Sequence, residues 1–346
     1  MVRTPLGVPP IGLKNRFIIT ILFFLAVACN RHPSPTQPTD PKPAKTVTVP
    51  VFNADSAYAY VKAQTDFGPR VPGTEAHASC AQWLVDKLAE YADTVMVQEF
   101  RTRLYTGKGM DGKNLIASFN PNAKKRIVLC AHWDSRPFAD HDSDEANWNH
   151  PIDGANDGAS GVGVLLEMAR GFKQQPLNEK LGVDLIFFDL EDYGPRQDLA
   201  EQYYDDRRNY WALGSQYWAA QPHLPGYTAN FGILLDMVGG SNPSFLKEYY
   251  SQGYAAWVSN KVWRMAQNLG YQEYFVNELG DPISDDHLPL NEVAGIPCID
   301  LIDLKPESSN GSFPETWHTL NDNLEHIDKQ TLEMVGNVLN HTVYQE

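Results

Sequence analysis

The chain has 346 residues, of which 42% are hydrophobic and 21% charged, and its formal net charge at pH 7 is −15. This length is enough for one large α/β domain with an ample buried core, and the composition is ordinary for a globular protein. The charge argues against a nucleic-acid partner, because phosphate binding depends on clustered lysine and arginine, and it favours cationic peptides instead.

The N-terminal segment has the pattern of an export signal. Basic residues up to Arg16 precede residues 17–28, which form an almost unbroken apolar run. A run of about a dozen residues is too short for a membrane span, which needs about 20, but it suits a secretory signal. The small residues before Cys29 resemble the lipobox of bacterial lipoproteins, although Ala26 stands where that motif usually has leucine.

We therefore expect residues 1–29 to be a signal peptide and Cys29 to carry a lipid anchor that holds the protein in the periplasm of a bacterial cell envelope. A plain signal peptide cleaved near Ala28 is the alternative. Residues 30–50 are rich in proline, threonine and lysine, which predicts a disordered tether. Residues 51–346 then form a single folded domain.

The cysteines after Cys29 each stand alone in an apolar stretch, which indicates small buried hydrophobic residues. At most one disulfide bond can join two of these three, and none of them belongs to a zinc-binding pattern. They are Cys80, Cys130 and Cys298.

Helical and strand-like patterns alternate along the domain. Apolar residues at three- and four-residue spacing predict helices, and short apolar runs predict strands. The predicted helices span residues 54–65, 74–91, 161–172, 255–269 and 327–339. The predicted strands span residues 94–100, 114–119, 126–131, 183–189, 231–236 and 297–302.

Two of these strands, at residues 127–129 and 185–188, lack alternating polar residues. Strands that are apolar on both faces belong in the middle of a sheet covered by helices on each side. The sequence therefore predicts a three-layer α/β sandwich with a central mixed, largely parallel sheet.

Acidic and imidazole side chains lie near the ends of the predicted strands: most follow a strand, residues 285–287 precede the last one, and Asp157 opens a helix. In an open α/β sheet, ligands bind beyond the carboxyl ends of the strands, so these side chains should converge. Taken singly, each has a simpler interpretation: a helix N-terminal acid, a solvated acidic loop, or a hydrogen-bonded structural histidine. Together they would repel one another unless a cation neutralised them, and mixed aspartate and histidine ligands suit zinc. The side chains are His132, Asp134, Asp157, Asp189, Glu191, Asp192, Asp236, Asp285, Asp286, His287 and His318.

The order of these motifs resembles the zinc exopeptidase superfamily, which contains two-zinc aminopeptidases and single-zinc glutaminyl cyclases. Two segments are similar to the cyclase branch: Asp-Asp-His-Leu-Pro-Leu at residues 285–290, and Phe-Pro-Glu-Thr-Trp-His-Thr-Leu-Asn-Asp-Asn at residues 313–323. The resemblance covers nearly all of the chain from Val51 onward. It implies that residues 51–346 are a zinc-dependent catalytic domain.

The resemblance also implies roles for individual residues. One zinc ion per chain would be held by Asp157, Asp192 and His318. Glu191 would be the general acid and base, supported by Asp236 and Asp286 as a hydrogen-bonded carboxylate pair. Trp317 would form a wall of the substrate pocket, for which core packing is the alternative.

The chain departs from the animal cyclases at two places. Those enzymes have glutamate where this chain has Asp192, and they have a second tryptophan in the loop that follows. Here Tyr193-Gly194-Pro195-Arg196 stands in that loop, so another aromatic residue, Trp148 or Tyr193, would have to close the pocket.

The implied activity is conversion of the N-terminal glutamine of peptides or proteins to pyroglutamate with release of ammonia. The main alternative is a two-zinc aminopeptidase, in which His132 and Asp236 would bind the second metal ion. A non-catalytic, zinc-stabilised binding module is a further alternative, and it would require Glu191 to be dispensable.

Overall fold

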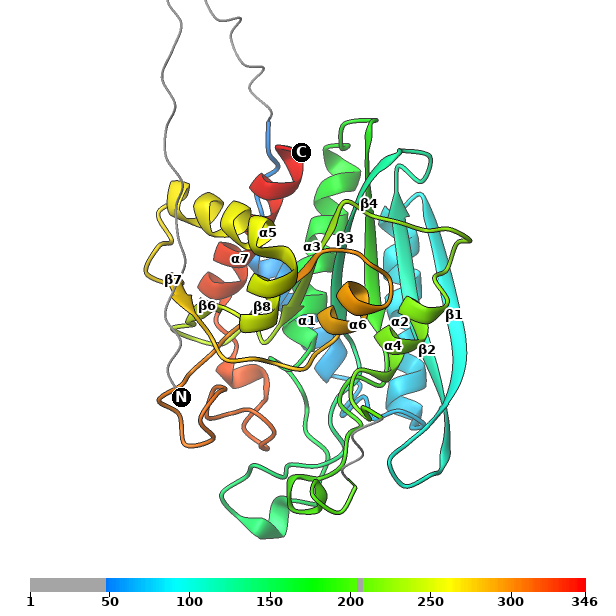
Figure 1. The fold of residues 1–346 in the computed structure, drawn as a ribbon, viewed down its shortest axis with the longest axis vertical. Coiled ribbons are helices and arrows are strands. Elements are labelled where there is room, and N and C mark those ends of the chain that lie inside the picture. The colour runs from blue at the N-terminus through cyan, green and yellow to red at the C-terminus, as the bar shows by residue number, and fades with distance from the viewer. Residues whose placement is uncertain (1–47, 204–207) are drawn as a thin grey trace, which may run out of the picture. The chain divides into compact units, whose positions relative to one another are not determined.

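The computed structural model describes residues 48–203 and 208–346. Thr46–Glu346 form one compact unit, and Figure 1 shows its ribbon. The predicted signal peptide, Cys29 and most of the predicted tether lie outside the described residues. Within the described residues no helix is both long and apolar enough to cross a membrane.

The central sheet has six strands in the order β1-β2-β4-β3-β5-β8. The four strands β4, β3, β5 and β8 run parallel, and β1 and β2 join antiparallel at one edge. This confirms the predicted mixed, largely parallel sheet. The strand bounds are Thr94–Arg103 (β1), Gly109–Phe119 (β2), Lys125–His132 (β3), Leu181–Phe188 (β4), Phe231–Asp236 (β5) and Cys298–Ile302 (β8).

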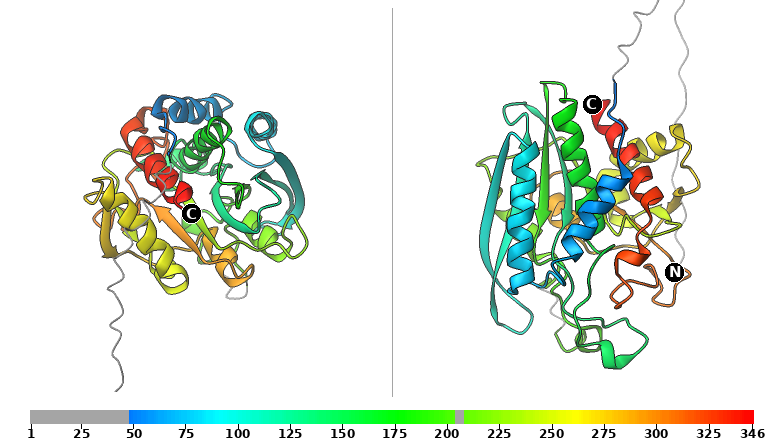
Figure 2. Two further views of the ribbon diagram at one scale, coloured as in Figure 1. Left: turned by 90° about the horizontal axis from the view of Figure 1, so that it is seen from above. Right: turned by 180° about the vertical axis from the view of Figure 1, so that it is seen from behind.

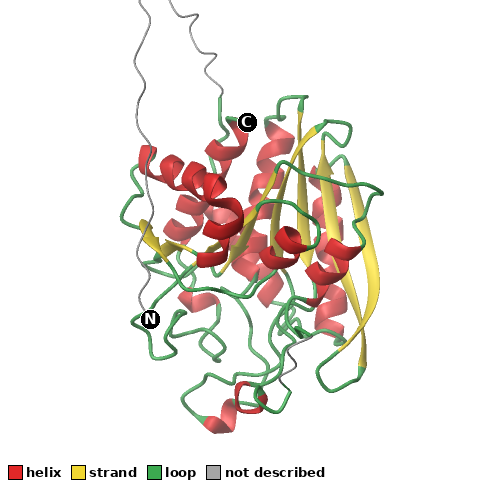
Figure 3. Ribbon diagram, viewed as in Figure 1, coloured by secondary structure: helices red, strands yellow, loops and turns green. Residues whose placement is uncertain are grey.

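Helices cover both faces of the sheet, as Figure 2 shows from above. One face packs against the larger hydrophobic core, to which α1 (Ala54–Thr65), α2 (Glu75–Tyr91), α3 (Ala159–Gln174), α5 (Tyr249–Asn268) and α7 (Lys329–Tyr344) contribute. The other face packs against a smaller core with α4 (Leu213–Ala220) and α6 (His287–Glu292). The three-layer sandwich is therefore confirmed, and Figure 3 shows the helices, strands and loops in separate colours.

The predicted helix boundaries follow local capping. The side chain of Asn53 accepts a hydrogen bond from the backbone of Ser56 at the start of α1, and Thr74 does the same for His77 at the start of α2. Such caps satisfy backbone donors that have no partner within the helix. Helix α5 begins earlier than predicted and has a non-helical residue at Ala255, where the sequence pattern places its start.

Several short elements were not predicted. These are α4, α6, and the strands β6 (Phe245–Lys247) and β7 (Phe275–Leu279), which pair in a separate parallel sheet. Elements this short carry too few residues to show a periodic pattern, and tertiary packing decides their conformation. The three cysteines of the described part of the chain are free and buried, as their apolar surroundings predicted.

Candidate active site and metal centre

The loops after the parallel strands gather the predicted acidic and imidazole side chains. Strand β3 ends at His132 and β5 ends at Asp236, while β4 leads directly into Asp189 and the Glu191-Asp192 pair. Parallel strands end at the same edge of a sheet, so these loops meet there. Leu190 has a φ of 57°, a left-handed conformation that is uncommon for residues with a side chain and turns the chain sharply before Glu191.

Asp157, Asp192 and His318 come together at this edge, as predicted. All three side chains are buried, and one ligand atom from each lies within 4.8 Å of the others. His318 Nε2 is 3.2 Å from Asp192 Oδ1 and 3.6 Å from Asp157 Oδ2. Zinc ligands about 2.0–2.1 Å from a tetrahedral ion lie about 3.4 Å apart, so this spacing fits three ligands of one ion.

The chemistry of these three side chains also fits zinc. Burial, followed by the charge of Asp157, raises the pKa of Asp192 well above its ordinary value, so a cation bound at this position would favour the ionised form of Asp192. Asp192 Oδ2 is buried and has no hydrogen-bond partner among the described residues. Burial, followed by the charge of Arg136, lowers the pKa of His318 to about 3, which keeps its ring in the neutral form that binds metal. Asp192 stands where the animal cyclases have glutamate. Its shorter side chain still lies within ligand distance of Asp157 and His318.

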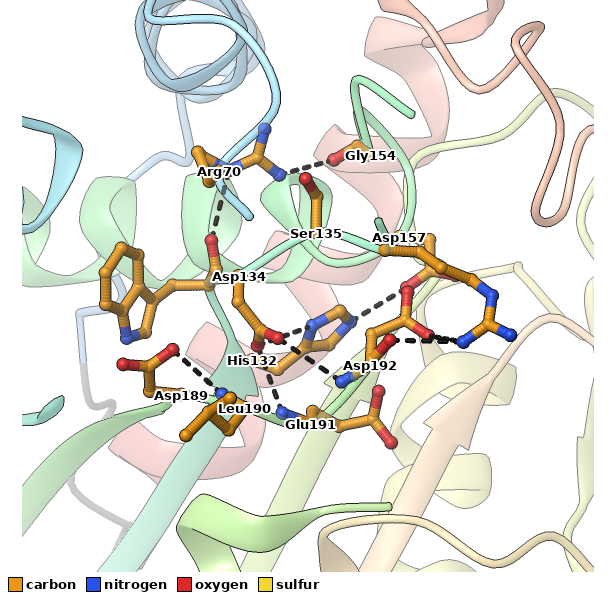
Figure 4. Close-up of polar contacts among 12 residues, drawn as sticks. Arg70, His132, Asp134, Ser135, Gly154, Asp157, Asp189, Leu190, Glu191 and Asp192 are labelled. Atoms are coloured by element: carbon orange, nitrogen blue, oxygen red, sulfur yellow. Dashed lines mark hydrogen bonds and ion pairs between the residues drawn. The ribbon is translucent and has the colours of Figure 1, made fainter. Parts of the chain in front are cut away.

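Two buried aspartates, Asp134 and Asp322, accept hydrogen bonds from the backbone of site residues, and Figure 4 shows Asp134. Asp134 Oδ1 and Oδ2 accept hydrogen bonds from the backbone N–H groups of Glu191 and Asp192, at 3.2 and 3.3 Å. Asp322 accepts from the backbone N–H of Asp157 at 3.1 Å. Both aspartates stand in the sequence motifs, but their role could not be predicted, because a hydrogen bond to a backbone N–H leaves no pattern in the sequence.

Arg136 lies against the same site and was not predicted. Its guanidinium is almost fully buried and donates to both carboxylate oxygens of Asp140, at 2.7 and 2.6 Å. It also donates to the backbone oxygen of Asp192 at 3.1 Å. His318 Nδ1 is 3.6 Å from Asp140 Oδ1, so the Arg136–Asp140 pair borders the ring nitrogen that faces away from the proposed ligand position.

A second group of buried side chains shares Asp157 with the first. His132 Nε2 is 2.9 Å from Asp157 Oδ1 and 3.3 Å from Asp236 Oδ1. The aminopeptidase alternative assigns His132 and Asp236 to a second metal ion, and with Asp157 they form a second group of potential ligands. The backbone at Gly158 passes very close to the His132 ring. A Cβ atom on Gly158 would lie 2.3 Å from His132 Nε2, so only glycine fits at that position.

Glu191 and Asp236 line one cavity with the three predicted zinc ligands, and Asp285 lines it as well, whereas the predicted Asp286 does not. Burial, followed by the charge of Asp285, raises the pKa of Glu191 well above its ordinary value. Burial, followed by the charge of Asp157, raises the pKa of Asp236 to about 7. The predicted hydrogen bond between Asp236 and Asp286 is absent from the described residues.

The turn at the start of α6 decides which of Asp285 and Asp286 reaches the cavity. The two aspartates are adjacent, so their side chains point in different directions. Asp285 points into the cavity, whereas Asp286 is fully buried and lies outside the residues that line it. Sequence alone could not choose between two neighbouring carboxylates.

Behind Asp285 the interior holds a further group of ionisable side chains. His287 Nε2 is 3.3 Å from Glu248 Oε2, and His287 Nδ1 is 3.8 Å from Asp300 Oδ2. All three side chains are fully buried. The carboxylates beside Glu191 therefore border an interior of ionisable side chains rather than an apolar core.

The cavity has a volume of about 510 Å³ and is walled by Trp317, Trp211, Phe313 and Ile283. The Trp317 ring stacks on His318 with centroids 3.7 Å apart, and the Trp211 ring lies parallel to His318 at 6.3 Å. Trp317 is therefore a cavity wall, as predicted.

The second aromatic of the wall is Trp211, and the prediction of Trp148 or Tyr193 was wrong. Tyr193 packs in a small hydrophobic cluster with Leu190, and Trp148 lines a neighbouring cavity. A long loop separates Trp211 from Asp192, so no local sequence motif connects Trp211 with the site.

The fold and this carboxylate–imidazole site define a metal-dependent α/β enzyme. The sequence profile of peptidase family M28 matches residues 114–343, and the chain belongs to this family. The donor atoms and the relatives of the chain support zinc as the metal.

Three known proteins show which members of the family the chain is similar to. It is 50% identical to a glutaminyl cyclase from Bacteroides thetaiotaomicron whose crystal structure has N-acetylhistamine bound, with 86% of this chain and 100% of that chain covered and a TM-score of 0.81. It is 47% identical to a zinc-dependent exopeptidase from Parabacteroides distasonis, with 86% and 100% covered and a TM-score of 0.83. It is 29% identical to the glutaminyl-peptide cyclotransferase of Bothrops jararaca, with 80% of this chain and 78% of that protein covered.

Proposed function

We propose that this protein is a zinc-dependent glutaminyl-peptide cyclotransferase, which converts the N-terminal glutamine of peptides to pyroglutamate and releases ammonia. The observation that carries the proposal is the cavity itself. An ionisable Glu191 and the Asp157–Asp192–His318 triad line the same cavity, whose walls include two tryptophan rings. The similarity to two glutaminyl cyclases supports the same activity.

The reaction joins two ends of one residue. The α-amine nitrogen of the peptide attacks the carbon of the glutamine side-chain amide, the bond from that carbon to the amide nitrogen breaks, and ammonia leaves. Zinc, when bound by the triad, would act as a Lewis acid on the amide carbonyl. Because the attack is intramolecular, the protein's task is to hold the reactive conformer and to manage protons.

Glu191 is positioned to move the protons. It takes one from the attacking amine and delivers one to the departing ammonia. A raised pKa suits this work, because the carboxyl group must both accept and donate a proton near neutral pH. Burial, followed by the charge of Asp285, maintains the raised pKa of Glu191. Trp211 and Trp317 exclude water and give the glutamine side chain two flat apolar surfaces.

The test is incubation of the purified protein with a peptide that begins with glutamine, followed by mass spectrometry. Loss of ammonia from the intact peptide is expected. Release of a free amino acid would instead identify an aminopeptidase, and no change to any peptide would favour a non-catalytic binding module.

The aminopeptidase is the second candidate, because His132, Asp157 and Asp236 form a second potential metal site. We propose that one zinc ion binds per chain, in the Asp157–Asp192–His318 triad. Elemental analysis of the purified protein should give one zinc ion, and His318→Ala should lower that content. Two tightly bound ions per chain would favour the aminopeptidase.

We further propose that the protein lies in the periplasm of a bacterial cell envelope, anchored through lipidated Cys29. The support is the apolar run at residues 17–28 and the small residues before the cysteine. In cells, Cys29→Ser should release the protein from the membrane fraction. Membrane association that survives this substitution would contradict the lipid anchor.

A further inference from the structure

A second cavity adjoins the one that holds Glu191. Its volume is about 540 Å³, and it is lined mainly by two segments, residues 140–148 and 309–321. The two cavities have five lining residues in common, so the space beside the metal triad continues into the second cavity. The shared residues are Asp140, His141, Gln197, Asn310 and Trp317.

The second cavity is negatively charged. Asp142 and Glu315 contribute carboxylates, and the described residues that line the cavity include no lysine or arginine. The third carboxylate, Asp140, is already paired with the guanidinium of Arg136 at 2.6 Å. Asp142 and Glu315 therefore have no cationic partner in this cavity.

Both free carboxylates are held in fixed positions by neutral donors. Asp142 accepts hydrogen bonds from the backbone N–H groups of Asp144 and Leu320, at 3.0 and 3.2 Å. Glu315 accepts from the backbone N–H of Ser309 at 2.7 Å. These contacts orient the two carboxylates and stabilise their charge without neutralising it.

The rest of the lining consists of hydroxyl and amide groups. Ser143, Thr319 and Asn321 lie on the same walls as the two carboxylates. Such groups both donate and accept hydrogen bonds, which suits the backbone of an extended peptide. The first cavity, by contrast, has walls of tryptophan, phenylalanine and isoleucine, which suit a single side chain.

We propose that this second cavity is the subsite for the second and third residues of the substrate, and that it selects peptides with lysine or arginine at one of those positions. The inference rests on the proposed cyclisation of an N-terminal glutamine. With the first residue in the tryptophan-walled cavity, the following residues pass Trp317 and Asn310 into the acidic cavity. The overall charge of −15 draws the same class of peptide toward the protein.

The experiment compares short peptides that begin with glutamine and carry lysine, norleucine or glutamate at position two or three. Norleucine matches the lysine side chain without its charge. We expect the kcat/KM of the lysine peptide to exceed that of the glutamate peptide by about fivefold, with the norleucine peptide between them, since two partly exposed charge pairs contribute modestly. The difference should lie in KM, because the subsite is remote from the reacting atoms, and should shrink at high salt.

Asn321→Lys tests the location of the subsite. Asn321 is exposed, lines the second cavity and has no part in the proposed chemistry. A lysine there should bring the ratio of the two kcat/KM values close to one, while Asn321→Gln should preserve the ratio. The matched control is Glu145→Gln, which removes an exposed charge from the same segment but outside both cavities.

The outcomes separate this inference from the proposed function. Equal kcat/KM values for the three wild-type peptides, or a charge preference that Asn321→Lys leaves unchanged, would overturn the subsite while the cyclase activity stands. Equal effects of Glu145→Gln and Asn321→Lys would assign the preference to the net charge of the protein and would also overturn it. Failure to cyclise any peptide would overturn the proposed function and the subsite together.

Discussion

Asp134 accepts a hydrogen bond from the backbone N–H of Glu191, and this contact connects the proposed proton-transfer residue with the segment that directly follows strand β3. The second oxygen of the same carboxylate accepts from the backbone of Asp192, a proposed zinc ligand. One buried side chain therefore positions both the proposed proton-transfer residue and a proposed zinc ligand. Figure 4 shows Asp134 beside Glu191 and Asp192.

Asp134→Ala should lower both zinc affinity and turnover, although this side chain lies outside the triad and the cavity lining. Groups that orient metal ligands typically change affinity or activity by about 10- to 100-fold. Zinc titration and steady-state kinetics measure the two effects, with Asp111→Ala as an exposed control. Loss of turnover with unchanged zinc affinity would contradict the shared role.

Glu191→Gln should keep the fold and the zinc content but lower kcat by about 100-fold or more, because the amide cannot accept the proton of the attacking amine. Circular dichroism and elemental analysis serve as controls for folding and metal content. Unchanged turnover would remove Glu191 from the mechanism.

Asp285→Asn and Asp286→Asn should differ, although the two residues are neighbours. Asp285 lines the cavity, so its loss should change the pKa of Glu191 and lower kcat by about 10-fold or more. Burial, followed by the charge of Asp285, raises the pKa of Asp286 well above its ordinary value, so we expect a neutral carboxyl group that asparagine replaces with little effect. Comparison of the two kcat values decides between the carboxylates, and a larger loss for Asp286→Asn would reverse the assignment.

Trp211→Ala should raise KM by about 10-fold, because it removes a wall of the cavity and the ring that the Arg136 guanidinium contacts at 4.7 Å. Trp211→Phe should recover part of this loss. Trp257→Ala, which removes an exposed tryptophan from α5, is the matched control. Equal KM values for the Trp211 and Trp257 variants would exclude Trp211 from the substrate pocket.

Asp184→Ala should lower the free energy of unfolding by about 3 kcal/mol or more, because it leaves a mostly buried guanidinium without its partner. The Nε and Nη2 atoms of Arg126 donate to the two oxygens of Asp184 at 2.8 and 2.6 Å. Urea denaturation measures the change. Zinc content should stay the same, since this pair lies outside the residues of the metal site, and a stability loss below about 1 kcal/mol would contradict a structural role for the pair.

Much of the fold was readable from the sequence because its signals are local. The apolar runs at 127–129 and 185–188 identified the central strands, and apolar residues at three- and four-residue spacing identified helices α1 and α2. The metal triad was also predicted, because each of Asp157, Asp192 and His318 stands in a motif of the family.

Some site residues could not be predicted from the sequence, because their roles depend on the direction of their side chains and on contacts with distant parts of the chain. The choice of Asp285 over Asp286 follows from the way the chain enters α6, and Trp211 reaches the cavity from the long loop after Asp192, outside any motif. The sequence by itself determined which kinds of side chain gather at the carboxyl edge of the sheet. Only the tertiary structure decided which of them face one another, because a side chain's direction depends on packing that no short stretch of sequence contains.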